Sequence, residues 1–311
     1  MTKYLVTGGA GFIGSHIATA LVIRGDQVRV FDNLSTGTRA NLEHLKGQAE
    51  FVEGDLLDRP ALEKAMSGVE VVYHQAALAS VPRSVVAPLD THAACVTGTL
   101  HVLDTARQAD VRRVVYAGSS SAYGNQPYMS KREQDVPMPL SPYAAAKFAG
   151  ESYCRAFTAT YGLETVTIRY FNVFGPRQDP QSEYSAVIPI FVTKMLAGTK
   201  PTVYGDGYQS RDFTYIDNVV AGNLAAADAP QASGQVFNIA CGRQFSLLDL
   251  LNSINNVLGT QIEAKFAEAR AGDVRESLAD ISAAREVLGY EPRVDFEEGL
   301  RRSIEYYRSL M

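Results

Sequence analysis

The sequence has few of the residues that mark secreted, metal-binding or membrane-spanning proteins. Its three cysteines, at positions 95, 154 and 241, form no CxxC pair, so we expect reduced thiols and a cytoplasmic protein. Its five histidines show no metal-ligand spacing, and we expect no metal site. The longest apolar run near the start, residues 17–23, is too short to cross a membrane. That run follows a glycine-rich loop instead of a basic segment, so we expect no signal peptide.

The chain also has little excess of one charge over the other. The chain has 29 lysines and arginines against 34 acidic residues, a net charge of −5 at pH 7. It therefore lacks the basic field of a nucleic-acid binder, and we expect no nucleic-acid partner. Hydrophobic residues make up 46% and charged residues 20%, as in an ordinary folded protein. The 311 residues are enough for about two domains without disulfides or a structural metal.

Short β-branched segments alternate along the chain with longer segments of helical period. The predicted strands are Tyr4–Thr7, Gln27–Phe31, Phe51–Glu53, Val69–His74, Val114–Gly118, Val166–Tyr170 and Val236–Ala240. The predicted helices are Ser15–Arg24, Ala61–Met66, Thr91–Gln108, Pro142–Tyr161 and Asp217–Ala227. Most of the strands are apolar on both faces, which is typical of a parallel sheet covered by helices. The alternation predicts an α/β fold with a Rossmann-type doubly wound parallel sheet.

The pattern changes after residue 174, where prolines punctuate the chain and predicted strands become scarce. We expect a first domain over residues 1–174 and a smaller mixed α/β C-terminal lobe over residues 175–311. Residues 212–245, which contain the last predicted strand, are expected to return to the first domain, so that the two are interleaved. In such sheets ligands bind at the carboxyl ends of the strands where the strand order reverses. The second lobe would cover that crevice.

A glycine-rich loop between the first strand and the first helix carries Gly8, Gly11 and Gly14. Glycines in this position permit a tight turn, the approach of backbone amides to a pyrophosphate, and close helix–strand packing. Asp32 ends the second strand, where a carboxylate binds an adenosine ribose and repels a 2′-phosphate, so the pattern favours NAD over NADP. The alternative is a plain turn in which Asp32 caps a loop. Asp55, at the end of the next strand, is either an adenine neighbour or a turn residue.

A tyrosine and a lysine, Tyr143 and Lys147, are spaced to share one face of a predicted helix. An ammonium near a phenol favours the phenolate, which makes Tyr143 a candidate general base. Ser119, Ser120 and Ser121 follow a predicted buried strand, at the edge of the sheet where substrates bind. The alternatives are a solvated surface pair and a polar turn.

Taken together, these motifs resemble the extended short-chain dehydrogenase/reductases, and more narrowly the UDP-hexose 4-epimerases. Further matching segments occur in the family's order along nearly the whole chain, at residues 74–77 (HQAA), 169–175 (RYFNVFG), 204–207 (YGDG), 211–213 (RDF) and 270–273 (RAGD). Residues 74–84 are similar to those of enzymes that accept N-acetylated UDP-hexoses.

The resemblance implies reversible inversion at C4 of a UDP-hexose through a transient 4-keto sugar and a tightly held NAD. Tyr143 would take the proton from the 4-hydroxyl, Lys147 would bind the nicotinamide ribose, and Ser119 would bond the sugar O4. The implied cofactor-binding residues are Gly8, Gly11, Phe12, Ile13, Gly14, Asp32, Asn33, Ser35, Thr36, Gly37, Asp55, Leu56, Gln75, Ala76, Ala77, Tyr143, Lys147 and Tyr170. The implied substrate-binding residues are Ser119, Ser120, Ser121, Tyr143, Asn172, Val187, Tyr204, Arg211, Arg270, Asp273 and Ser277.

The size of the side chain at position 277 is expected to decide which sugar 2-substituent the site accepts. Many relatives carry a bulky aromatic residue near the sugar 2-substituent at the position of Ser277, and serine leaves room for an N-acetyl group. We therefore expect UDP-GlcNAc/UDP-GalNAc interconversion, together with UDP-Glc/UDP-Gal activity. One alternative is an enzyme for UDP-glucose and UDP-galactose only, in which other walls close the pocket. Another is a non-catalytic nucleotide-binding member, against which the presence of Ser119, Tyr143 and Lys147 counts.

The sequence departs from the family at two positions near the cofactor. Cys95 replaces an asparagine on the nicotinamide side, and Ala79 replaces a pyrophosphate-binding lysine of some relatives, so retention of NAD is less secure than the fold. Ser121 replaces the acidic residue of the related 4,6-dehydratases and decarboxylases, which argues against those activities. The resemblance also implies a homodimer that pairs the helices predicted at 91–108 and 142–161. Their extra apolar positions are explained nearly as well by packing in the core.

Overall fold

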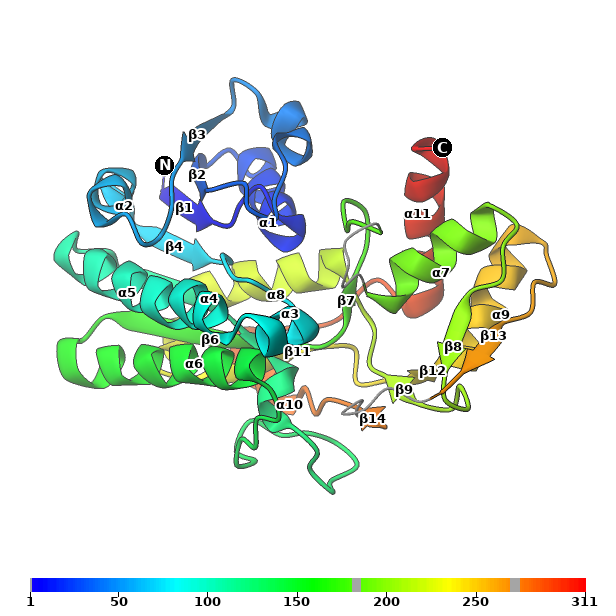
Figure 1. Cartoon of the computed structure of the whole chain (residues 1–311). Helices are drawn as coiled ribbons and strands as arrows, with labels where there is room; N and C mark the ends of the chain where they lie inside the picture. Colours follow the sequence, from blue (N-terminus) through cyan, green and yellow to red (C-terminus); the bar gives the residue numbers. More distant parts are fainter. Residues whose placement is uncertain (1, 181–185, 269–274) are drawn as a thin grey trace.

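The computed structural model describes residues 2–180, 186–268 and 275–311. Figure 1 shows a large part built around a sheet and a smaller part that contains α7 (Val187–Leu196), α9 (Leu247–Leu258) and α11 (Phe296–Ser309). No helix in the described ranges is long and apolar enough to span a membrane.

The main sheet has seven parallel strands in the order β11-β6-β5-β4-β1-β2-β3. They are β1 (Lys3–Thr7), β2 (Gln27–Asp32), β3 (Ala49–Glu53), β4 (Val71–His74), β5 (Arg113–Ser119), β6 (Glu164–Tyr170) and β11 (Val236–Ile239). The chain runs outward from β1 in one direction and then restarts at β4 on its other side. In sheets of this kind, such a reversal is where a ligand crevice is expected, here at the carboxyl ends of β1 and β4. The expected doubly wound Rossmann-type fold is confirmed.

Helices cover both faces of this sheet because adjacent strand residues point to opposite sides. Val6 of β1 belongs to a buried cluster with α1 (Phe12–Ile23) and α8 (Ile216–Asp228). Leu5, its neighbour, belongs to a separate cluster with α2 (Arg59–Met66), α5 (Gly98–Gln108) and α6 (Pro142–Tyr161). The strands are therefore apolar on both faces, as their sequences indicate.

Two helical regions near the site compare differently with the prediction: α6 matches it, and the region predicted at 91–108 does not. Helix α6 has the predicted bounds, because Ser141 caps its N-terminus, Pro142 occupies its first turn and Gly162 ends it in the left-handed conformation. The helix predicted at 91–108 is not regular. It consists of α4 (Pro88–His92), a π-helical turn at Ala93–Thr97 and α5, preceded by α3 (Val81–Val86). The π-helical turn contains Cys95.

The smaller lobe is held by helices and very short strands. In the described residues, β7 (Val173–Phe174) pairs with β10 (Thr214–Tyr215), and β8 (Thr202–Tyr204) pairs with β13 (Lys265–Ala267). In a further small sheet, β9 (Ser210–Arg211) lies between β12 (Phe245–Ser246) and β14 (Glu276–Ser277) and pairs with both. Stacked and edge-on aromatic rings from Phe174, Phe213, Phe245 and Phe296 join these segments. Helices α7, α9, α10 (Ser282–Leu288) and α11 are not anticipated by the sequence analysis. The strand β11 crosses back from this region to pair with β6.

Candidate active site

The glycine-rich loop packs so closely against neighbouring backbone that larger residues would not fit at Gly8 or Gly14. Gly8 has a φ of +66°, and a Cβ there would fall 2.5 Å from the backbone nitrogen of Ala76, which follows β4. A Cβ at Gly14 would fall 2.3 Å from the carbonyl oxygen of Gly8. The loop therefore brings the backbone of β4 close to the start of α1, where free amides favour a phosphate. This cradle fits the pyrophosphate of a dinucleotide.

The residues that follow β2 lie against the same loop. Asp32 is buried, and its carboxylate accepts hydrogen bonds from the backbone nitrogens of Ala10 (2.9 Å) and Leu34 (2.8 Å). Asn33 donates its side-chain amide to the Asp55 carboxylate at 2.7 Å, so the ends of β2 and β3 are joined. A Cβ at Gly37 would fall 2.8 Å from the carbonyl carbon of Ala10. These contacts form a polar edge suited to an adenosine ribose.

The remaining predicted cofactor residues are distributed around this crevice. Phe12 and Ile13 occupy the first turn of α1, Ser35 and Thr36 belong to the exposed loop after β2, Leu56 follows β3, and Gln75, Ala76 and Ala77 follow β4. Their roles toward NAD stay predictions.

Tyr170 is tied into the interior at the end of β6. Its hydroxyl lies 3.0 Å from Gln75 Oε1 and 2.9 Å from Asn223 Oδ1. Burial raises the pKa of this phenol. Asn223, on α8, was missed by the sequence analysis, because an amide on the buried face of a distant helix carries no motif. The three side chains connect β4, β6 and α8 beneath the crevice.

The three predicted catalytic residues meet where β5 ends and α6 begins. Tyr143 lies in the first turn of α6, close to Ser119, the last residue of β5. Ser119 Oγ is 2.8 Å from Ser121 Oγ and accepts a hydrogen bond from the backbone nitrogen of Ser121. Lys147, one helical turn beyond Tyr143, is buried and donates to the carbonyl oxygen of Ala117 at 2.9 Å. Ser120 lies beside them in the short helical turn Ser120–Tyr123.

The surroundings of Tyr143 disfavour its ionised form in this structure. Burial and the neighbouring Cys95 thiol raise the pKa of Tyr143 above the usual 10.0, whereas the nearby Ser119 hydroxyl lowers it. Burial also lowers the pKa of Lys147. Removal of a substrate proton by Tyr143 therefore requires charge stabilisation within the assembled site.

His74, at the end of β4, is not available as a base. Its Nδ1 is 2.7 Å from Thr7 Oγ1 and its Nε2 is 2.9 Å from Thr99 Oγ1, so both ring nitrogens are engaged. Burial lowers its pKa to about 3, which keeps the imidazole neutral. Its role is to join β1, β4 and α5 behind the crevice.

A cavity of about 390 Å³ in the smaller lobe collects predicted substrate residues. Asn172, Val187, Tyr204 and Arg211 line it, although they come from four separate segments. The lining also includes Phe174, Phe191, Lys194, Gln209 and Phe213, none of which was predicted as a site residue. The cavity thus combines apolar and aromatic walls with cationic side chains, a combination suited to a base and a diphosphate.

The last three predicted substrate residues are Arg270, Asp273 and Ser277. Arg270 and Asp273 lie outside the described residues. Ser277 is half-buried on β14 and is paired in register with Arg211 on β9. Sixty-six positions separate these two residues in the chain, so only the fold brings them together.

Asp212, next to Arg211, holds this corner of the lobe together. Its carboxylate accepts hydrogen bonds from the backbone nitrogens of Cys241 and Gly242, both at 2.9 Å, and of Ala279 at 3.3 Å. Its own backbone nitrogen donates to the carbonyl oxygen of Ser277 at 2.7 Å. Asp212 therefore positions both Arg211 and Ser277. It was missed as a site residue because its partners are backbone groups from remote segments.

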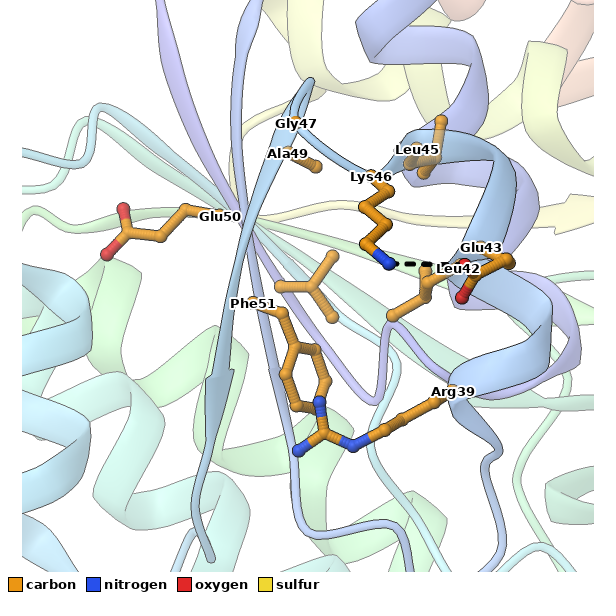
Figure 2. Close-up of a pocket in the computed structure, with 10 residues that line it drawn as sticks. Arg39, Leu42, Glu43, Leu45, Lys46, Gly47, Ala49, Glu50 and Phe51 are labelled. Carbon is orange, nitrogen blue, oxygen red and sulfur yellow. Dashed lines mark ion pairs between the residues drawn. The ribbon is translucent and has the colours of Figure 1, made fainter.

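A second cavity, of about 360 Å³, lies outside the predicted site, between the 3₁₀ helix Arg39–Leu45 and the edge strand β3. Figure 2 shows Arg39 extending over the ring of Phe51, with 4.5 Å between the guanidinium carbon and the ring centroid. Arg39 pairs with Glu53 and Lys46 pairs with Glu43. Since its charges neutralise one another, this cavity offers less for a charged ligand than the cavity around Arg211.

Comparisons with a family model and with individual proteins agree, and the individual proteins match over nearly the whole chain. The profile of the NAD dependent epimerase/dehydratase family matches residues 4–240. The UDP-glucose 4-epimerase of Mycolicibacterium smegmatis is 39% identical, with 99% of each chain covered. Among solved structures, the UDP-N-acetylglucosamine 4-epimerase of Methanobrevibacter ruminantium, in complex with UDP-N-acetylmuramic acid, is 40% identical with a TM-score of 0.96 and covers 100% of this chain and 99% of its own. The UDP-glucose 4-epimerase of Thermotoga maritima, with UDP-glucose, is 38% identical with a TM-score of 0.95 over 99% of both chains.

Proposed function

The chain belongs to the NAD dependent epimerase/dehydratase family, and we propose that it interconverts UDP-GlcNAc and UDP-GalNAc, with UDP-Glc and UDP-Gal as further substrates. It is an NAD-dependent isomerase of the UDP-hexose 4-epimerase type. The observation that carries the proposal is that Ser119, Tyr143 and Lys147 lie together where β5 ends and α6 begins, at the carboxyl edge of the sheet.

NAD⁺, when bound, supplies the acceptor for a hydride from C4 of the sugar. The cradle of Gly8, Gly11 and Gly14, together with Asp32, is proposed to hold it. Tyr143 takes the proton of the 4-hydroxyl, and Ser119 keeps that hydroxyl aligned with the phenol. After the ketone has rotated, Tyr143 would return the proton to the sugar oxygen while the hydride goes back to the other face of C4. Because both the proton and the hydride return to the sugar, the net reaction consumes no oxidant.

The nucleotide must be bound through groups that do not react, because the hexose has to turn between the two half-reactions. Arg211 and Asn172 are proposed to bind the diphosphate, since both line the cavity and a guanidinium binds phosphate oxygens in a bidentate manner. Val187 and Tyr204 are proposed to flank the uracil. These groups keep the UDP part in place while the sugar is free to rotate.

The preference for N-acetylated sugars is proposed from the small side chain of Ser277. Its register with Arg211 on β9 places it beside the proposed diphosphate site, where a hexose attached to that diphosphate would lie. The 40% identical relative named for UDP-N-acetylglucosamine supports this preference, whereas the relatives named for UDP-glucose support the alternative of an enzyme for UDP-glucose alone.

The test is chromatographic. The purified protein is incubated separately with UDP-GlcNAc and with UDP-Glc, without added NAD, and the 4-epimers are separated. Formation of UDP-GalNAc supports both the roomy pocket and retained NAD. Turnover of UDP-Glc alone would keep the reaction and refute the argument from Ser277. If neither substrate yields its 4-epimer even after NAD is added, the proposed function is refuted.

We further propose that a second copy of the chain covers the exposed face of α3, α4 and α6. Val85, Val86 and Leu89 are each at least 65% exposed, and Tyr153 on α6 is partly exposed. By contrast, Val96 and Leu103, two apolar residues of the helix predicted at 91–108, are buried. Light scattering should show a dimer that Val86→Asp disrupts and that Ile23→Asp, at an equally exposed position on α1, leaves intact.

A further inference from the structure

Asn238 is a buried residue whose side-chain amide joins three segments of the chain. It lies on β11 and has no exposed surface. Its Oδ1 accepts a hydrogen bond from the Tyr123 hydroxyl at 2.7 Å. Its Nδ2 donates to the backbone carbonyl oxygens of Lys131 and Asp280, both at 3.0 Å. Because only the nitrogen can donate to two carbonyl oxygens, these contacts fix the orientation of the amide and use both of its N–H groups.

One end of this connection is the turn that follows Ser119. Tyr123 is the last residue of the helical turn Ser120–Tyr123, which begins directly after Ser119. The Tyr123 side chain is buried, and its ring lies 4.5 Å from the guanidinium carbon of Arg169. The Tyr123 ring is therefore held in place by its surroundings, and its hydroxyl fastens the turn to Asn238 on β11.

The other end of the connection is the segment that continues from Ser277. The backbone nitrogen of Lys131 donates to the carbonyl oxygen of Leu278 at 2.9 Å. The backbone nitrogen of Asp280 donates to the carbonyl oxygen of Lys131, also at 2.9 Å. Asn238 therefore binds both chains of this pairing, and a shift of either chain would break one of its hydrogen bonds.

The two ends of this connection carry groups from the two ends of the proposed sugar site. Ser119 is proposed to bond O4 of the hexose, and Ser277 is proposed to lie beside the 2-substituent. Since O4 and the 2-substituent belong to one ring, the groups that contact them must be held at a matching separation. A misplacement of about 1 Å can cost about 100-fold in rate, even when the change lies far from the reacting atoms.

We propose that Asn238 is a positioning residue that fixes the separation between Ser119 and Ser277, and thereby supports both turnover and sugar selectivity. This inference rests on the proposed function, because it takes the hexose to lie between these two serines. Asn238 acts through the segments that it joins, since it has no surface with which to touch the sugar. It is also not part of the lining of the 390 Å³ cavity. Its loss should therefore lower kcat and leave the affinity for UDP nearly unchanged.

The first test is Asn238→Asp, which keeps the shape of the side chain and its acceptor for Tyr123. The substitution replaces the N–H donors with an oxygen that faces the two carbonyl oxygens. We expect kcat for the better of UDP-GlcNAc and UDP-Glc to fall about 10-fold or more. The ratio of kcat/KM between the two substrates should move towards one, because a looser wall discriminates less. The affinity of the NAD-containing protein for UDP, measured by calorimetry, should stay within about 3-fold.

Two further variants accompany this test. Tyr123→Phe removes the hydroxyl at the other end of the connection and should change kcat and selectivity in the same direction, but less strongly. Asn255→Asp is the matched control, because Asn255 on α9 also donates its side-chain amide to a carbonyl oxygen, that of Ile262 at 2.9 Å. It should change neither kcat nor selectivity.

The outcomes separate this inference from the proposed function. If the unchanged protein epimerises neither UDP-sugar, the proposed function fails and this inference fails with it. If the unchanged protein is active and Asn238→Asp keeps its kcat and selectivity, the reaction stands and the role of Asn238 is refuted. A loss of UDP affinity in step with the loss of turnover would also refute it, because Asn238 would then support the fold at large. If Asn238→Asp does not fold, Tyr123→Phe decides, and normal kcat and selectivity in that variant refute the proposal.

Discussion

Glu151 and Arg169 form an ion pair inside the protein, and its loss should destabilise the fold. Glu151 lies one helical turn beyond Lys147 on α6, and Arg169 lies on β6. Hydrogen bonds of 2.7 and 2.9 Å join the guanidinium to both carboxylate oxygens. The side chain of Glu151 is 2% exposed and that of Arg169 is 1% exposed. The pair thus fastens the helix that carries Tyr143 and Lys147 to the sheet.

The magnitude follows from what remains after Glu151→Ala. The guanidinium of Arg169 would stay buried, with the Tyr123 ring 4.5 Å away and the carbonyl oxygen of Glu133 at 3.5 Å. Removing one partner of a buried pair costs about 3–5 kcal/mol. The ring offsets about 1 kcal/mol of this. We therefore expect a loss of about 2–4 kcal/mol in the free energy of unfolding.

The double variant Glu151→Met/Arg169→Met should lose less than either single truncation, because no charge is left buried. The assay is urea unfolding of the NAD-containing protein followed by circular dichroism. Glu305→Ala removes an exposed partner of Arg301 on α11 and should cost less than about 1 kcal/mol. A loss below about 1 kcal/mol for Glu151→Ala, or a double variant less stable than both single ones, would refute the reasoning.

Four further changes test the site. Tyr143→Phe should lower turnover of UDP-hexose at least about 100-fold while NAD stays bound, as seen by absorbance; near-normal turnover would rule out this residue as the base. Ser277→Tyr should lower kcat/KM for UDP-GlcNAc relative to UDP-Glc by about 10-fold or more in a coupled assay, and an unchanged ratio would contradict the pocket argument. Gly8→Ala should abolish NAD binding in a fluorescence titration, because its Cβ would collide with the backbone of Ala76; normal affinity would show that the loop does not hold the cofactor. The pKa of His74 is about 3 in the folded protein and 6.5 for a free histidine. The free energy of unfolding should therefore decrease as the pH drops from about 6.5 towards 3, by up to about 1.4 kcal/mol per pH unit.

The histidine effect is checked by unfolding His74→Gln and the exposed control His92→Gln across that pH range. A lowered pKa means that the unfolded chain binds the proton more readily, so acid favours unfolding. His74→Gln should flatten the profile and His92→Gln should not. Parallel profiles for the two variants would contradict the assignment.

The order of strands and helices in the first domain could be predicted from sequence because each element has its own period. Helix α6 is the clearest case, since its cap Ser141, first-turn Pro142 and terminal Gly162 are local signals. The smaller lobe was predicted less well. Its strands are two or three residues long, which is too short to show an alternation of apolar and polar residues. The sequence analysis also predicts no helix where the structure has α7 and α9.

From the sequence alone one can predict the chemistry of single segments: the glycine loop with Asp32, the serines around the end of β5, and the spacing of Tyr143 and Lys147 on one helix face. These depend on neighbours a few residues apart, which backbone geometry places predictably. Only the tertiary structure decided which distant segments meet. The pairing of Arg211 with Ser277 and the buried carboxylate of Asp212 between three segments both depend on contacts between remote parts of the chain. Such contacts leave no periodic trace, because a hydrogen bond to a distant backbone group constrains position in space and not spacing in sequence.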